Sequence, residues 1–250
     1  MAQPNRLLVA FLGSAAALAV LGGVPAAQAG FDGNPLTVTA FADGGLTTSW
    51  QLPRNWGTWN GNDWSYDGTG HSYEMWAGST LLGTISNLRM DIIADPQIIL
   101  TFTAQANSAT TKFVFSSAVV NFGPLTNPTG QASAGVTVTD NNGDGAFLSG
   151  LEPDGRSYWA NYNGAVPGGT NYASFIQAVS ATPSQGTNTA SDSLGPSIIP
   201  GSVSSMNAQF SFNLSPFDAA SGTSDYRIVP APGVLTLLGL GGLTALRRRR

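Results

Sequence analysis

The sequence contains no cysteine and a single histidine, His71, among its 250 residues. Without cysteine no disulfide can constrain the chain, so the fold has to be held together by a buried core. The same scarcity argues against a zinc site of the ordinary type, which takes several cysteine or histidine ligands.

Positive charge is scarce outside the two ends of the chain. Between residues 30 and 229 there are five basic side chains against 14 acidic ones, so this segment has a formal charge of −9. Proteins bind phosphate backbones through clustered basic surfaces. We therefore expect no nucleic-acid partner.

The motifs of several common enzyme classes are also missing. The sequence has no G-x-S-x-G, no H-E-x-x-H and no glycine-rich phosphate loop. A glycoside hydrolase needs two carboxylates beside the scissile bond, and Glu74 with Glu152 or Asp154 could supply them. Nothing in their spacing requires such a site, so we do not expect an enzyme and keep a glycoside hydrolase as the third functional hypothesis.

The N-terminal 29 residues have the features of an export signal. Arg6 is their only charged side chain, an apolar stretch runs from Leu7 to Leu21, and Ala27-Gln28-Ala29 follows a Pro25 break. This pattern is typical of a secretory signal peptide that is cleaved before Gly30. A retained membrane anchor is the alternative, and the A-x-A site favours cleavage.

The tail, residues 229–250, combines three features of a membrane stop signal. It begins with a Pro-x-Pro segment, continues with 13 uncharged residues from Val234 to Leu246, and ends in four arginines. Guanidinium groups resist transfer through hydrocarbon, so the arginines should stay cytoplasmic while the body lies across the membrane. A helix of this length covers about 20 Å, against a hydrocarbon core of roughly 30 Å. So short a span favours a temporary stop that is processed afterwards.

This tail closely resembles the PEP-CTERM sorting signal of Gram-negative bacterial surface proteins, which pairs a Pro-Glu-Pro motif with an apolar helix and an arginine cluster. Ala231 stands where that family has Glu. The resemblance implies transient anchoring in the inner membrane, a membrane protease called exosortase as partner, and association with exopolysaccharide and biofilm matrix. The sorting residues would be Val229, Pro230, Ala231, Pro232, Arg247, Arg248, Arg249 and Arg250.

The body of the chain is dominated by strand patterns. Apolar and polar residues alternate over 36–42, 88–94 and 206–214, which puts one face of each strand in a core and the other in water. Residues 97–106 and 111–122 are rich in β-branched and aromatic side chains, as strands are. The polar residues 107–110 between these two segments predict a hairpin.

Several short strands with turn residues between them predict an all-β protein, an antiparallel β-sandwich of jelly-roll type over residues 30–214. One helical candidate is 171–180, where four apolar residues have helical spacing, and an irregular strand is the alternative. The polar segment 181–200 predicts a long exposed loop. Residues 215–228 should hold a last turn and a linker to the tail.

Residues 50–76 hold five of the six tryptophans, interleaved with tyrosine, asparagine and aspartate. Flat rings can stack on the C–H faces of a sugar, while amides and carboxylates bind its hydroxyls. Exposed large aromatics without such a purpose would form a costly apolar patch. The alternative is that the rings fill the core. The candidate sugar-binding residues are Trp56, Trp59, Trp64 and Tyr66, and a platform requires at least two exposed indoles.

The segment 140–145 fits the opening of a calcium loop, D-x-[DN]-x-[DN]-G, with Asp140, Asn142 and Asp144 as candidate Ca²⁺ ligands. Position twelve of the loop is Leu151, which departs from the EF-hand pattern, and the strand at 136–139 excludes an EF-hand helix pair. The alternative is a simple hairpin turn at Asn142-Gly143.

The leading hypothesis from the sequence is a secreted structural or adhesive protein of the cell surface or extracellular matrix. A carbohydrate-binding module that uses residues 50–76 is the second. These two differ in whether the tryptophans are exposed beside groups that bind hydroxyls.

The arginine cluster provides a test of the sorting signal. Replacing Arg247 to Arg250 with Ser should remove the cytoplasmic stop, so the protein should reach the periplasm or medium unprocessed. Cell fractionation and intact mass measure location and processing. If both are unchanged, the sorting hypothesis is wrong.

Overall fold

The computed structural model describes residues 30–152 and 154–231. The expected signal peptide lies outside the described residues, and so does the expected sorting signal from Pro232 onward. Within them, no helix has the length and apolar character to cross a membrane.

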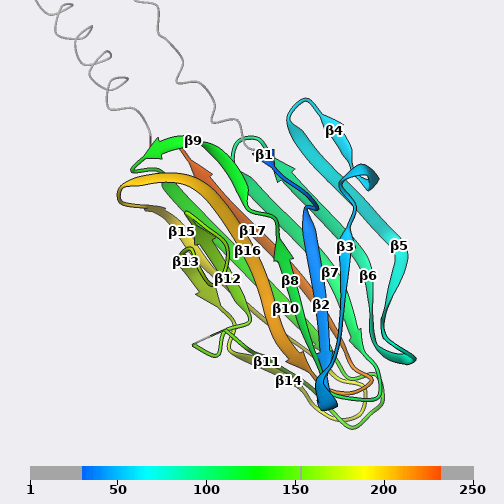
Figure 1. Ribbon diagram of the computed structural model, residues 1–250. Coiled ribbons are helices and arrows are strands. Elements are labelled where there is room, and N and C mark those ends of the chain that lie inside the picture. The colour runs from blue at the N-terminus through cyan, green and yellow to red at the C-terminus, as the bar shows by residue number, and fades with distance from the viewer. Residues whose placement is uncertain (1–29, 153, 232–250) are drawn as a thin grey trace, which may run out of the picture.

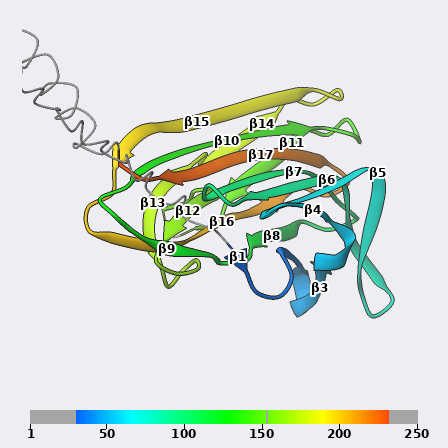
Figure 2. The same ribbon diagram turned by 90° about the horizontal axis from the view of Figure 1, so that it is seen from above.

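The described chain forms two antiparallel sheets that pack face to face, so the prediction of an all-β antiparallel sandwich is confirmed (Figure 1). Figure 2 shows the two layers, with β15, β10 and β17 in one and β9, β16 and β8 in the other. Two short 3-10 turns are the only helical elements in the described ranges: η1 (Asp43–Gly45) and η2 (Arg54–Trp56).

Sheet A has the order β1-β9-β16-β8-β2-β3, and β11 to β14 extend it beside β16. Its strands are β1 (Gly30–Phe31), β2 (Leu36–Ala42), β3 (Leu46–Leu52), β8 (Thr111–Ser117), β9 (Val120–Thr126), β11 (Ala146–Gly150), β12 (Tyr158–Tyr162), β13 (Thr170–Phe175), β14 (Ala178–Ala181) and β16 (Ser202–Leu214).

Sheet B has the order β15-β10-β17-β7-β6-β5-β4. Its strands are β4 (Thr58–Asn60), β5 (Asp63–Ala77), β6 (Thr80–Ile93), β7 (Gln97–Ala106), β10 (Thr129–Thr139), β15 (Thr187–Ile198) and β17 (Ala219–Val229).

The core lies between the sheets, and aromatic rings fill its centre. Phe102 of sheet B stacks on Phe115 of sheet A, with ring centroids 3.8 Å apart, and meets Phe210 of β16 edge to face at 5.1 Å. Buried and partly exposed residues alternate along β7 and β10, as the period of a strand with one core face requires.

The expected hairpin at 107–110 is wrong. β7 is hydrogen-bonded to β6 and β17 on its two sides, so it has no free edge for the next strand. The chain instead crosses to the other layer, where β8 pairs with β2 and β16. β7 and β8 each turn one face toward the same core, one from each layer. Each strand therefore alternates buried and partly exposed residues, as the two strands of a hairpin also do.

The helical candidate at 171–180 is also wrong, because the segment forms most of β13 and then β14. Ile176, between the two strands, has a φ of 63°. This kink interrupts the strand alternation and leaves Phe175, Ile176 and Val179 all buried. The result is an apolar spacing that imitates a helix.

Two expected connections are strands of sheet B. Most of the segment 181–200 is β15, an edge strand paired with β10 alone, and its exposure on both faces explains its polar composition. The expected linker at 215–228 contains most of β17, which lies between β10 and β7. The β-domain therefore extends to Val229, the first residue of the expected sorting signal.

Gly222 of β17 provides a test of this interior packing. A Cβ atom at Gly222 would lie 2.4 Å from Cζ of Phe102. Gly222→Ala should therefore lower the free energy of unfolding by about 1–3 kcal/mol through overpacking, as measured by urea denaturation.

The matched control is Gly135→Ala in the neighbouring strand β10, where the nearest atoms to an added Cβ lie at an ordinary 3.6 Å. This change should stay within about 0.5 kcal/mol. Equal effects of the two substitutions would contradict the central position of β17.

Candidate functional site

The tryptophan-rich segment lies at one side edge of the sandwich. It runs from β3, the edge strand of sheet A, through η2 and β4 into β5 of sheet B (Figure 1). The segment thus closes the gap between the two sheets at this edge. That position explains why it contains both buried and exposed rings.

Trp64 belongs to the core and is excluded from any exposed platform. Its side chain has no solvent exposure, and its Nε1 donates a hydrogen bond to the carbonyl oxygen of Arg54 at 2.9 Å. The backbone at Gly57 lies directly on the indole, since a Cβ there would come within 2.3 Å of the ring. Trp64 therefore holds the loop that carries Trp56, and the prediction that it contacts sugar is wrong.

Trp56 is the exposed ring of an aromatic cluster. Its side chain is 49 % exposed, and its ring packs against Trp50, Tyr66 and Tyr73 with centroids 5.9–6.4 Å apart. The hydroxyls of Tyr66 and Tyr73 form a hydrogen bond with each other. Burial, and then this bond, raise the pKa of Tyr66, so it stays a neutral phenol. The cluster supports the Trp56 ring from behind.

A groove of about 430 Å³ lies beside Trp56 on the outer face of sheet B, and we call it the Trp56 groove. Aromatic residues, hydroxyls and charged groups line it together: Trp56, Thr58, Ser65, Tyr66, Asp67, Arg89 and Asp91. The aromatic members come from η2 and β5, and most of the polar members come from outward positions of β4, β5 and β6. Such a lining can offer a ring face and hydroxyl partners to one ligand.

The Trp56 groove contains two carboxylates and one guanidinium, so its charges cancel only in part. Arg89 Nη2 lies 3.4 Å from Asp67 Oδ2 in an exposed ion pair. Hydrogen bonds from Thr69 lower the pKa of Asp67. Burial raises the pKa of Asp91, against the opposing effect of Arg89. The two carboxylates provide acceptors, and the guanidinium provides donors, for the hydroxyls of a polar ligand.

Trp59 stands apart from this groove. Its ring is 45 % exposed and stacks on Phe31, with centroids 5.8 Å apart, and the Arg54 guanidinium lies about 5 Å from the centroids of both rings. The requirement of two exposed indoles is met by Trp56 and Trp59. However, the expected platform is divided, because only Trp56 and Tyr66 line the groove.

Arg89 and Asp91 are members of the groove that sequence reasoning did not identify. Both lie at the water-facing positions of the alternating segment 88–94, so the pattern gave their orientation. Their nearness to Trp56 depends on the pairing of β6 with β5, in which Asp67 faces Arg89 and Ser65 faces Asp91.

The expected calcium loop joins β10 of sheet B to β11 of sheet A, so the alternative of a hairpin turn is wrong. The structure adds a third carboxylate, Asp218, to the expected ligands Asp140 and Asp144. One oxygen of each of these three carboxylates lies within 4.8 Å of the others. Hard cations such as Ca²⁺ take ligands of this type. Asp218 was missed because its segment was taken for a linker.

The loop also has internal hydrogen bonds that hold its shape. Asp140 accepts bonds from the backbone N–H of Gly143 at 2.7 Å and of Gln185 at 2.9 Å. Burial favours the neutral acid, yet these backbone donors lower the pKa of Asp140 overall. Asn142 accepts a bond from the backbone N–H of Asp144 at 3.1 Å. Calcium binding by this loop stays a prediction.

Calcium should raise the melting temperature if the three carboxylates bind it, because a ligand of the folded state stabilises that state. The gain is about 2.7 kcal/mol at a calcium concentration of 100 Kd. Asp144→Asn should shrink the rise, since Asp144 is the exposed member of the cluster and its loss disturbs no buried hydrogen bond. Differential scanning calorimetry with EDTA and with millimolar calcium measures the effect.

The control is Asp192→Asn, which removes an exposed carboxylate from β15. It should leave the calcium-dependent rise unchanged. If calcium produces no shift in the wild type, or an equal shift in the Asp144 variant, the segment is a turn only.

The carboxylates considered for a glycoside hydrolase lie on different sheets. Glu74 is exposed on β5 of sheet B and accepts a hydrogen bond from Trp76 Nε1 at 2.8 Å. Glu152 is buried just after β11 of sheet A, where it accepts a bond from Gln209 Nε2 at 2.7 Å, and burial raises the pKa of Glu152. Asp154 lies near Glu152 in the chain and accepts a bond from Ser174. None of these carboxylates lines the Trp56 groove.

Comparison with known proteins gives no family. No family model and no curated protein matches the chain. One solved structure, titled "CBM4 structure and function", aligns with 67 % of this chain and 87 % of its own chain at 15 % identity, with a TM-score of 0.22. A TM-score this low carries no argument about function, so the function has to be inferred from the geometry of the groove.

Proposed function

We propose that this protein is a non-catalytic carbohydrate-binding protein of the bacterial cell surface or extracellular matrix, with a β-sandwich of jelly-roll type that binds sugar in the Trp56 groove. The observation that carries the proposal is the composition of that groove. An exposed indole and a phenol stand beside two carboxylates, a guanidinium and two hydroxyls. Sugars present both C–H faces and hydroxyls, and this lining matches both.

The rigidity of the groove supports the proposal. The Trp56 ring packs against three other aromatic rings, and the buried Trp64 holds the loop that carries it. A ring that is already fixed loses little conformational entropy when a ligand stacks on it. An exposed ring of this kind would otherwise be an unfavourable apolar surface.

Delivery to the surface is the second part of the proposal and rests on the sequence. The expected signal peptide would export the chain, and the tail would hold it in the inner membrane until an exosortase-type protease acts. Because β17 ends at Val229, the Pro-x-Pro segment follows directly from a central strand of the folded domain. On the surface, polysaccharide binding would give the protein an adhesive role in the matrix.

The test is retention of the purified domain in native gels that contain exopolysaccharide from the bacterium that makes the protein. Trp56→Ala should abolish retention, because it removes the exposed ring face of the groove. Its matched control is Trp76→Ala. Trp76 is 48 % exposed, close to the 49 % of Trp56, but lies outside the groove.

Trp76→Ala should migrate as the wild type does, and thermal melts should show that both variants are folded. Absence of retention in the wild type would overturn the carbohydrate-binding proposal and leave a structural role. Equal retention of the wild type and of Trp56→Ala would exclude the Trp56 groove as the site.

A further inference from the structure

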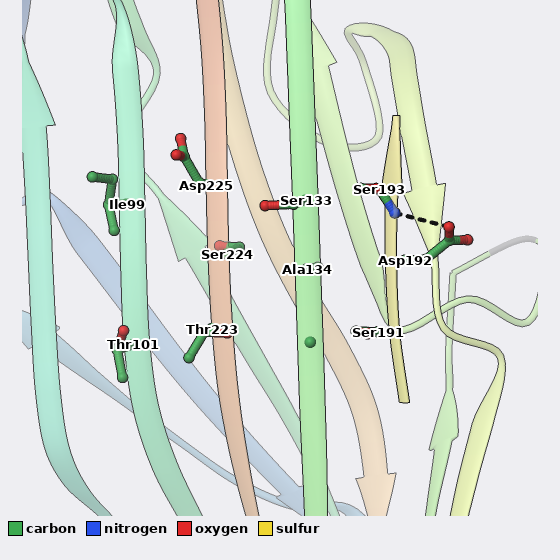
Figure 3. A pocket seen from close by; sticks show the side chains of 11 residues that line it. Ile99, Thr101, Ser133, Ala134, Ser191, Asp192, Ser193, Thr223, Ser224 and Asp225 are labelled. Atoms are coloured by element: carbon green, nitrogen blue, oxygen red, sulfur yellow. Dashed lines mark hydrogen bonds between the residues drawn. The ribbon is translucent and has the colours of Figure 1, made fainter. Parts of the chain in front are cut away.

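Next to the Trp56 groove, the outer face of sheet B holds a second depression of about 610 Å³, which we call the central groove. It crosses four neighbouring strands, β7, β17, β10 and β15, and Figure 3 shows its side chains on these strands. Ser and Thr hydroxyls, two aspartates and Ile99 make up most of its lining. No aromatic residue lines it.

The two grooves share the same cross-strand rows of residues. In one row Asp91 of the Trp56 groove is paired with Ile99, and the row continues through Asp225 and Ser133 to Ser193. Residues paired across neighbouring strands of an antiparallel sheet lie side by side on one face. The row therefore leads from one groove directly into the other.

A second row repeats this arrangement one step along the strands. Arg89 of the Trp56 groove is paired with Thr101, followed by Thr223, Gly135 and Ser191 of the central groove. The two rows together form a track that runs perpendicular to the strands. Between β5 and β15 the track crosses five strand spacings, which is about 24 Å.

Where the two rows cross the central groove, their hydroxyls are free for a ligand, unlike those of the row beside them. In that neighbouring row Thr103 bonds to Ser221 at 3.0 Å, and Thr137 bonds to Thr189 at 2.8 Å. Among the described residues, the hydroxyls of Thr101, Ser133, Ser191 and Thr223 make no such bond. These groups point outward on an uncovered face.

We infer that the track binds a linear, uncharged polysaccharide along its length, with one part of the chain on Trp56 and the following sugars across the central groove. This inference rests on the proposed function and specifies its ligand. The track is longer than a mono- or disaccharide, so it suits internal segments of a polymer rather than its ends.

The charges of the track argue for a neutral polymer. Asp67, Asp91 and Asp225 lie in the two rows, whereas Arg89 is the only cation within them and is paired with Asp67. A polyanionic polymer would meet like charges along this surface. The hydroxyl-rich face is also unlike the apolar centre of a subunit interface, which disfavours a second copy of the chain as occupant.

The first test is the dependence of affinity on chain length. Calorimetry compares a disaccharide with a hexasaccharide made from the neutral polysaccharide that the domain retains. The hexasaccharide should bind about tenfold more tightly, which one or two additional net hydrogen bonds would provide. Equal affinities would overturn the track and leave the Trp56 groove as a short site, whereas absence of all binding would overturn the proposed function itself.

The second test places a larger side chain in the central groove. Gly135→Val places a side chain between Ser191 and Thr223 in ordinary contact, since an added Cβ lies 3.6 Å from each of them. It should abolish the gain from the longer chain and leave disaccharide affinity unchanged. Thr223→Val, which removes only a hydroxyl, should reduce the gain in part.

The matched control is Gly123→Val, an exposed strand glycine of β9 in sheet A with no atom within 4 Å of an added Cβ. It should bind as the wild type does. If Gly135→Val keeps the full gain, the track is wrong. If the wild type is a dimer in sedimentation and Gly135→Val makes it a monomer, the face joins two copies and the inference also fails.

Discussion

The contact between the two sheets is the interaction on which the rest of this structure depends. No disulfide is possible, so the aromatic stack of Phe102 on Phe115, extended by Phe210, has to hold sheet B against sheet A. Rings this large require a close approach of the backbone, and Gly222 provides it beside Phe102. This packing involves the inner faces of the two sheets. It leaves the outer face of sheet B uncovered and holds its shape.

The Trp56 groove depends on a second buried ring, Trp64. The same sequence segment contains both a buried ring and exposed rings, since Trp64 faces the core while Trp56 and Trp59 face water. Because Gly57 has no side chain, the loop can lie directly on the Trp64 indole. This contact fixes the position of the neighbouring Trp56. Function and stability therefore share one loop, and the two tryptophans have opposite roles only eight positions apart.

The outer face of sheet B shows how pairing register can assemble a binding surface from polar residues that are far apart in the chain. Thr101, Thr223 and Ser191 are unremarkable as single positions. The antiparallel ladders put them in one row with Arg89, next to the aromatic groove. A site of this kind has no sequence motif, because the spacing of its members is set by the lengths of the connections between strands.

The sequence by itself determined the class of fold, the orientation of residues within its regular strands, and the segment that carries the exposed rings, because these follow from the two-residue period and from composition. It also indicated Asp140 and Asp144 as neighbours, since they lie in one short loop. Only the tertiary structure decided that β7 and β8 lie in different sheets, that β17 is central, and that Asp218 and Asp91 join their sites. The physical reason is that strand pairing is a long-range choice between similar amphipathic segments, and local alternation does not encode which partner is chosen.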